Sequence, residues 1–359
     1  MAVIVFFVSF LISLALTLPT IYLAKKLNFV TDRKKRSHPA HTHKGIIPRA
    51  GGLPIYLSIL LTTLLFISIN KIMIGILLSS FILLIVGLID DYSDSSPYLR
   101  FIANIVISTI VVFFGLGIPY LSNPFGGVIH LDTLKLNINF FGTHSILLIA
   151  DILAIIWLTW TTNIVNWSKG VDGQLPGFVA ITAFFLGLLS QRFTGHDISA
   201  QVVMLFSFVV AGAYLGFLPF NFYPQKIMPG YGGGALAGFL LGIISILSFG
   251  KLGTAVLILS IPIIDSIYTI IRRLIKKQSP FRADWGHFHH RLMEIGWGKR
   301  RIAIFYWLIS LILGISSMFL KGIEKLIAFC TIGIVLLVFI ILIEKIKKTE
   351  HDPNLQILS

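Results

Sequence analysis

Long apolar runs, separated by short polar segments, fill most of this sequence. A run of about 20 apolar residues is long enough to cross a bilayer as a helix. The pattern predicts an all-α integral membrane protein of about eleven transmembrane helices, in a single domain over residues 1–348 with a cytoplasmic tail at 349–359. The expected spans cover approximately residues 3–24, 53–69, 72–89, 99–121, 146–164, 175–191, 198–220, 234–249, 252–272, 302–320 and 324–344.

The composition agrees with a membrane protein and excludes several other classes. Hydrophobic residues make up 56% of the 359 residues and charged residues only 12%, and the mean hydropathy is +0.89. Soluble globular chains have roughly a quarter charged residues, so a soluble fold could not cover this much apolar surface. Disordered chains and coiled coils are excluded as well, and the single cysteine excludes a disulfide scaffold.

The basic residues decide the orientation. With the N-terminus outside and the loops on alternating sides, most of the 29 Lys and Arg residues fall in inner segments. Cytoplasmic loops of membrane proteins carry such an excess. We therefore expect an N-out, C-in topology, and the net charge of +14 requires no nucleic acid to explain it.

One outer segment, at residues 122–145, is long. Its sequence GVIHLDTLKLNINF alternates apolar and polar residues, which is typical of paired strands. We expect a small β-hairpin on the outer side, and we expect the loops of the active site on the cytoplasmic side.

Acidic residues are scarce, so their positions are informative. A carboxylate beside hydrocarbon is costly and is a functional candidate by default. Six of the 15 acidic residues lie at or near cytoplasmic ends of spans, namely Asp90, Asp91, Asp94, Asp172, Asp265 and Asp284. Their placement predicts a polar active site at the inner surface of the membrane.

The segment GLIDDYSDSSPYLRF carries the first motif. Asp90 and Asp91 close a span, where a helix dipole disfavours negative charge. We interpret them as a working pair, in which one carboxylate holds a cation or a metal-bound phosphate and the other accepts a proton. Asp94 is either a substrate-binding residue or part of the turn before Ser96 and Pro97, which have the pattern of a helix N-cap.

The segment NIVNWSKGVDGQLPG carries the second motif. Asn163 and Asn166 share one helical face, where their amides could bind a sugar or a base. Asp172 stands between two glycines and could approach a phosphate or a metal ion closely. The alternative is a polar turn between two spans.

A glycine-rich segment, KIMPGYGGGALAGFLLG, follows. Its first glycines, Gly230, Gly232 and Gly233, could form a phosphate-binding nest of backbone N–H groups. Close packing between helices is the alternative. Packing best explains Gly238 and Gly242, which continue a spacing of four residues.

Two basic segments supply candidate ligands for anions. In the largest inner loop, His287, His289, His290 and Arg291 suit phosphate or diphosphate oxygens, and their spacing matches no zinc finger. Lys44, in HTHKGIIPRAGG, is a further candidate. The alternative for both segments is a solvated basic loop that contacts anionic lipid.

These motifs, in this order, resemble the polyprenyl-phosphate N-acetylhexosamine-1-phosphate transferase superfamily, of the glycosyltransferase family 4 type. The likeness is greater to its undecaprenyl-phosphate N-acetylglucosamine-1-phosphate transferase branch. Family sequences show a lysine-bearing HxxxxPxxGG segment, then DDxxD, NxxNxxDGxDGL, MGDxGS and HxHH. The corresponding segments here are HKGIIPRAGG, DDYSD, NIVNWSKGVDGQL, MPGYGG and HFHH, between about Asp32 and Trp297.

The resemblance implies an enzyme of the cell inner (plasma) membrane, active in cell-envelope biogenesis with its site in the cytoplasm. It would transfer a sugar-1-phosphate, of the N-acetylhexosamine type, from a UDP-sugar to polyprenyl (undecaprenyl) phosphate and release UMP with the help of Mg²⁺. The expected partners are these two substrates and the lipid bilayer, without nucleic acid. A homodimer is left open.

The resemblance also implies roles for individual residues. Asp90 would deprotonate or orient the lipid phosphate, and Asp91 would help to hold metal or phosphate. Asn163, Asn166 and Asp172 would line the nucleotide-sugar pocket, with Asp172 a second candidate ligand for magnesium. The three histidines would bind the sugar diphosphate.

Two departures from the family motifs bear on the metal. Lys169 replaces the first Asp of NxxNxxDGxDGL, and Tyr231 replaces the Asp of MGDxGS, which is the metal ligand of the family. A site that loses a carboxylate and gains an ammonium should hold magnesium less well. In addition, Trp285 stands where the family usually has Arg.

Several explanations remain open. In the first, Lys169 neutralises phosphate charge itself; in the second, the enzyme uses a different sugar nucleotide. In the third, the chain is a diverged protein that binds polyprenyl phosphate or a nucleotide sugar without catalysis. From a different class, a secondary transporter would place its ionisable residues near the middle of the bilayer, whereas here they cluster at one face.

Overall fold

The computed structural model describes residues 1–32, 45–139, 143–192, 198–248, 252–279 and 285–350. Most of these residues are helical, because long apolar segments satisfy their backbone hydrogen bonds internally as helices. The helices are α1 (Ala2–Lys26), α2 (Gly52–Phe66), α3 (Lys71–Ser93), α4 (Pro97–Phe113), α5 (Leu148–Trp167), α6 (Gln174–Gln191), α7 (Ile198–Asn221), α8 (Gly230–Leu247), α9 (Leu252–Ile258), α10 (Ser260–Ile275), α11 (Phe288–Glu294), α12 (Lys299–Phe319) and α13 (Gly322–Glu350).

Each expected span corresponds to one helix or to one bent pair. Within the described residues, eight helices are long and apolar enough to cross a membrane, and the pair α9 and α10 makes a ninth if it counts as one span. Helices α2 and α4 are apolar but shorter. The predicted class, an all-α integral membrane protein, is confirmed. The expected break near residue 348 falls inside α13, and residues 351–359 lie outside the described part.

Three short strand pairs interrupt the helices. They are β1 (Val30–Asp32) with β2 (Ile46–Pro48), β3 (Tyr120–Ser122) with β4 (Val128–His130), and β5 (Lys135–Asn139) with β6 (Thr143–Leu147), all antiparallel. The outer segment therefore forms two hairpins where one was expected. The cause is the turn before β4, where Gly126 and Gly127 have φ values of +114° and +80°, so β4 folds back onto β3.

Helix α8 occupies the middle of the bundle, and the first 17 of its 18 residues are buried. It packs against α2, α3 and α5, and glycines allow the close approach. A Cβ atom on Gly238 would collide with the Thr161 carbonyl oxygen, and one on Gly242 would lie 2.5 Å from the Thr161 hydroxyl oxygen. The packing role predicted for these two glycines is confirmed.

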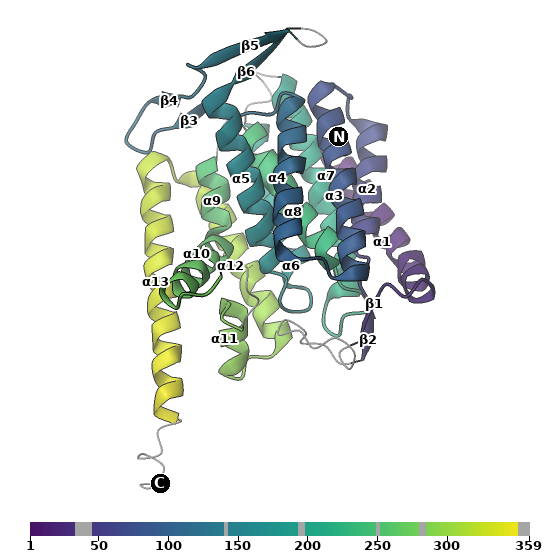
Figure 1. The fold of residues 1–359 in the computed structure, drawn as a ribbon, viewed down its shortest axis with the longest axis vertical. Helices are drawn as coiled ribbons and strands as arrows, with labels where there is room; N and C mark the ends of the chain where they lie inside the picture. Colours follow the sequence, from purple (N-terminus) through teal and green to yellow (C-terminus); the bar gives the residue numbers. More distant parts are fainter. Residues whose placement is uncertain (33–44, 140–142, 193–197, 249–251, 280–284, 351–359) are drawn as a thin grey trace.

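The two ends of the bundle differ. Figure 1 shows strands β3 to β6 at one end, and β1, β2, α11 and the C-terminus towards the other. Helices α3 and α5 finish, and α8 begins, at the second end. Because these three termini meet there, the motifs that flank them are brought together.

Candidate functional site

The last turns of α3 carry the acidic pair. Asp90 and Asp91 are 0% and 1% exposed. The helix stops just beyond them because Asp94 adopts a left-handed conformation, and its N–H donates to the Asp90 carbonyl oxygen at 2.8 Å. The Ser96 hydroxyl then accepts from the Leu99 N–H at 3.2 Å, so the expected N-cap of α4 is confirmed. The tight turn returns α4 beside the acidic pair.

Asp91 joins α3 to the start of α8. Its Oδ1 accepts from the Tyr231 backbone N–H at 2.8 Å and lies 3.2 Å from the Arg49 Nε. Gly230 has a φ of +69°, and a Cβ there would collide with the Asp91 carboxylate. A carboxylate at a helix N-terminus satisfies an unpaired N–H group and interacts favourably with the helix dipole. Only glycine at position 230 allows this approach.

Asp90 pairs with the first turn of α4. Its Oδ2 lies 3.3 Å from the Arg100 Nη1, and its Oδ1 is buried without a hydrogen-bond partner among the described residues. The Arg100 side chain is 29% exposed. The arginine therefore lies between the buried carboxylate and the outside of the cluster.

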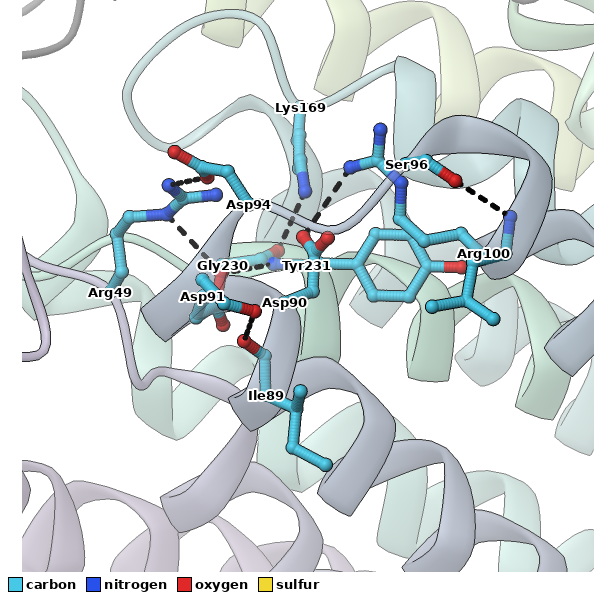
Figure 2. Close-up of polar contacts among 12 residues, drawn as sticks. Arg49, Ile89, Asp90, Asp91, Asp94, Ser96, Arg100, Lys169, Gly230 and Tyr231 are labelled. Atoms are coloured by element: carbon cyan, nitrogen blue, oxygen red, sulfur yellow. Dashed lines mark hydrogen bonds and ion pairs between the residues drawn. The ribbon is translucent and has the colours of Figure 1, made fainter.

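Lys169 and Tyr231, the two departures from the family motifs, lie beside the acidic pair and contact each other (Figure 2). The Lys169 ammonium donates to the Gly230 carbonyl oxygen at 2.7 Å. It lies 5.7 Å from the centre of the Tyr231 ring, and the Arg100 guanidinium lies 5.4 Å from the same centre. The Tyr231 hydroxyl donates to the Asn104 Oδ1 at 3.1 Å.

Charges in this carboxylate–cation cluster balance. It contains Asp90, Asp91 and Asp94 on one side and Arg49, Arg100 and Lys169 on the other, since Arg49 also bonds Asp94 at 2.8 Å. Burial lowers the pKa of Lys169 to about 8, although the carboxylate of Asp91 opposes this shift. Burial also lowers the pKa of Arg49, but Asp91, Asp94 and Asp90 outweigh it and raise that pKa above its usual value.

The segment from Trp167 to Gly173 is the α5–α6 loop. It connects the carboxylate–cation cluster with His289 and with Lys299. Lys169 reaches the start of α8, whereas Gly170 packs so closely under His289 that a Cβ there would collide with the imidazole. Asp172 lies 3.0 Å from the Lys299 Nζ and accepts from the Gln225 Nε2 at 3.0 Å. Consecutive parts of one loop thus contact the carboxylate–cation cluster, His289 and Lys299.

The histidines form the second group. His287 lies 3.0 Å from Asp265, whose other oxygen accepts from the Phe288 N–H at 2.8 Å. The rings of His287 and His289 stack at 5.8 Å, and the His290 ring lies 4.1 Å from that of His289. Burial, and then His290 and His287, lower the pKa of His289 well below its usual value. A neutral imidazole therefore lies against the α5–α6 loop.

Arg291 points away from the other predicted site residues. Its guanidinium bonds the Glu344 carboxylate of α13 at 2.7 Å and the Gly286 carbonyl oxygen at 3.2 Å, and it lies over the Tyr268 ring. These contacts favour a role in holding α11 to the bundle.

The two asparagines differ in their surroundings. The Asn163 amide donates to the Thr159 carbonyl oxygen of its own helix at 2.7 Å. The Asn166 Oδ1 is buried without a hydrogen-bond partner among the described residues, and it faces Gly234 at the start of α8. Asn166 therefore lies against the carboxylate–cation cluster, whereas Asn163 is already bonded.

The glycines predicted as a phosphate nest are closely packed. A Cβ on Gly232 would lie 3.5 Å from the Gly87 Cα, and one on Gly233 would lie 3.3 Å from the Gly52 N. These contacts favour the packing alternative for Gly232 and Gly233. Gly230 instead supplies the carbonyl oxygen that binds Lys169.

A divalent cation does not fit the residues present. Among the described residues, no group of three or more His, Cys, Asp or Glu side chains could hold a metal ion. The two predicted metal ligands each pair with a different cationic side chain: Asp91 pairs with Arg49, and Asp172 pairs with Lys299. The remaining oxygen of Asp91 faces the Cα of Gly230.

Lys44, the further candidate for binding an anion, lies outside the described residues.

Sequence reasoning missed Arg100, Asn104 and the partner of Asp265. Arg100 looks like an ordinary positive charge at a cytoplasmic helix end. Its position in the first turn after a three-residue break is the signal that could have placed it beside the last turn of α3. Asp265, one of the six acidic residues at cytoplasmic span ends, binds His287 and the Phe288 N–H.

Comparisons with known proteins identify the family of the chain. Residues 73–249 match the family described as glycosyl transferase family 4. The chain is 30% identical, over 89% of its length and 85% of the relative, to a probable undecaprenyl-phosphate N-acetylglucosaminyl 1-phosphate transferase of Bacillus subtilis. It is 29% identical, over 75% of its length and 71% of the relative, to a decaprenyl-phosphate N-acetylglucosaminephosphotransferase of Mycolicibacterium smegmatis. A phospho-N-acetylmuramoyl-pentapeptide-transferase of Staphylococcus saprophyticus is 27% identical over 89% of the chain and 98% of the relative.

Proposed function

The chain belongs to glycosyl transferase family 4, a family of phosphosugar transferases, and from that premise we propose its substrates and the roles of its residues. The acceptor is polyprenyl phosphate, and the donor is a UDP-sugar. The enzyme transfers the sugar-1-phosphate, of the N-acetylhexosamine type, and releases UMP. The reaction takes place at the cytoplasmic face of the plasma membrane, and the multi-pass helical bundle anchors the enzyme beside its lipid substrate.

The observation that carries this proposal is the carboxylate–cation cluster at one end of an apolar bundle. Three fixed cations, Arg49, Arg100 and Lys169, surround two buried carboxylates. Cations of this density suit the phosphates of two anionic substrates, and the carboxylates keep the cations ordered until substrate arrives. A transporter would carry such residues near the middle of its helices, and here they lie at helix ends.

The proposed reaction joins two phosphates. A phosphate oxygen of the acceptor attacks the sugar-linked phosphorus of the donor, and the bond from that phosphorus to the oxygen bridging to the nucleotide breaks. The bridging oxygen leaves with UMP. An acceptor phosphate that binds Arg100 draws this side chain from Asp90, and the freed carboxylate takes any remaining proton of the acceptor. Positioning and charge supply most of the catalysis in phosphoryl transfer.

The predicted residues outside the carboxylate–cation cluster serve the donor in this proposal. Asn166 has a free amide oxygen towards the start of α8 and would bind the nucleotide sugar. His287, His289 and His290 would contact its diphosphate, since imidazole N–H groups can donate hydrogen bonds to phosphate oxygens. Asp172 acts by holding the α5–α6 loop in place through Lys299.

An exchange assay with purified protein in nanodiscs tests the proposal. We expect UMP release from a UDP-N-acetylhexosamine only when polyprenyl phosphate is present. Asp90→Asn should lower the rate by about 100-fold or more, as does the loss of a catalytic acid–base group. Asp132→Asn is the matched control, because Asp132 lies by β4 at the opposite end of the bundle with a half-exposed side chain. If no UDP-sugar gives acceptor-dependent UMP, or if Asp90→Asn is fully active, the proposal is wrong.

A further inference from the structure

Enzymes of this family generally depend on a divalent metal ion, yet the cluster in this chain is neutral before any metal binds. Three carboxylates, at Asp90, Asp91 and Asp94, face three cationic side chains. Hard divalent cations bind through several oxygen ligands, of which carboxylates are the strongest. Within the described cluster, the buried carboxylate oxygens without a hydrogen-bond partner are the Oδ1 of Asp90 and the Oδ2 of Asp91. A divalent ion would therefore add two positive charges beside three fixed cations, and the cluster would offer it two buried carboxylate oxygens, one of them packed against Gly230.

We propose that the Lys169 ammonium replaces the divalent cation of the transferase site and provides the positive charge for the donor diphosphate. The inference rests on the proposed function for its donor, but its central statement, that this site does not bind a divalent metal, is independent of any activity. It distinguishes this chain from relatives that carry aspartates at the positions of Lys169 and Tyr231.

The position of Lys169 supports the proposal. Its ammonium donates to the Gly230 carbonyl oxygen at 2.7 Å, so it lies at the first residue of α8, where Asp91 also binds. An ammonium held there interacts with the Asp91 carboxylate, as a metal ion would, and adds to the positive end of the helix dipole. The side chain is half-buried, so the charge is partly shielded from water and acts more strongly on a nearby phosphate.

Tyr231 supports the proposal from the other side. A carboxylate at this position would face two cations, whereas the ring lies within 5.7 Å of the Lys169 ammonium and 5.4 Å of the Arg100 guanidinium. An aromatic face attracts a cation by about 0.5–2 kcal/mol without neutralising its charge. The tyrosine thus holds both cations in place and leaves their charges available to an anion. Its hydroxyl is turned away to Asn104.

Metal binding can be measured directly, without substrate. We propose to titrate metal-free protein in nanodiscs with Mn²⁺ and to follow free Mn²⁺ by electron paramagnetic resonance. Wild-type protein should bind no stoichiometric Mn²⁺, whereas the double variant Lys169→Asp with Tyr231→Asp should bind one ion. Lys226→Asp is the control, because it makes the charge change of Lys169→Asp at an exposed loop position and should bind none. One stoichiometric ion in the wild type, lost in Asp91→Asn, would overturn the inference.

Activity gives a second, separate result. With a chelator, the wild-type rate should change by less than about twofold, and Lys169→Met should lose about 100-fold, as expected when one fixed group that stabilises developing charge is removed. A wild-type rate that disappears with the chelator and returns with Mg²⁺ contradicts the inference. If no donor is turned over at all, the proposed function fails, and the Mn²⁺ titration of wild type and double variant still decides the metal question. Should the double variant not fold, Lys169→Asp alone replaces it.

Discussion

Single residues at the end of α3 show what a sequence can reveal about a site. Two adjacent carboxylates at the end of an apolar span are costly, so Asp90 and Asp91 can be recognised without a structure. Their partners cannot be recognised in this way. Arg49 and Arg100 look like the positive charges of any cytoplasmic loop, and only the fold brings them to 3.2 and 3.3 Å from the acidic pair.

Lys169 gives a pH dependence that can be tested. Burial lowers its pKa to about 8, so its ammonium is present below that pH and is lost as the pH rises through it. Arg49, Asp90, Asp91 and Arg100 face the same space, and none of them reverses this direction. We expect the transfer rate to fall as the pH rises through about 8, and we expect Lys169→Arg to retain its rate to higher pH, because arginine stays charged.

The measurement is a pH–rate profile of both proteins with saturating acceptor. The ratio of the two rates cancels any titration of the substrates. A ratio that does not change between about pH 7 and 9.5 would show that the Lys169 charge does not govern the rate.

At the scale of elements, hydrophobic periodicity placed every helix that the structure describes as a span. It failed where a local turn overrode the pattern. The expected span at 99–121 ends early, because α4 stops at Phe113 and β3 begins at Tyr120. The expected outer hairpin became two, because a pair of glycines with positive φ turns the chain just before β4. Apolar alternation alone does not reveal which strand pairs with which.

The contact between α3 and α8 can be tested with one methyl group. A Cβ on Gly87 would collide with the backbone of Gly232, so Gly87→Ala must push the start of α8 away from Asp91. Overpacking of this kind costs about 1–3 kcal/mol, and we expect a lower midpoint of thermal unfolding together with a lower transfer rate.

Gly253→Ala is the matched control for this prediction. Gly253 lies in α9 with no atom within 4 Å of the added Cβ, and alanine favours a helix over glycine by about 1 kcal/mol. We expect unchanged or slightly higher thermal stability for Gly253→Ala. A Gly87→Ala protein as stable and active as the wild type would show that the two helices do not meet as described.

At the scale of the whole molecule, the fold class follows from composition, but the meeting of the motifs does not. Asp172 and His289 are more than a hundred positions apart in the chain, yet the α5–α6 loop that carries Asp172 packs under His289 at Gly170. Long-range contacts of this kind depend on how helices pack, and helix packing is not encoded in the periodicity of any single helix.

The orientation in the membrane remains a prediction and can be measured by labelling. In a Cys330→Ser background, which removes the single native cysteine, a cysteine is introduced either by Asn123→Cys, in the turn between β3 and β4, or by Lys276→Cys, at the end of α10. The positive-inside rule predicts that an impermeant maleimide labels position 123 in intact cells and position 276 only after permeabilisation. The reverse pattern would place the site outside and would rule out a cytoplasmic nucleotide donor.

The contact between Lys169 and Tyr231 also bears on how this lineage arose. The ammonium lies over the ring, so neither side chain could be exchanged for an aspartate alone without leaving a mismatched neighbour. Descendants of an ancestor with two aspartates would have passed through such an intermediate, and the two changes should have been fixed close together in time. Among relatives, lysine at the first position should then accompany an aromatic residue at the second, as an inherited pair.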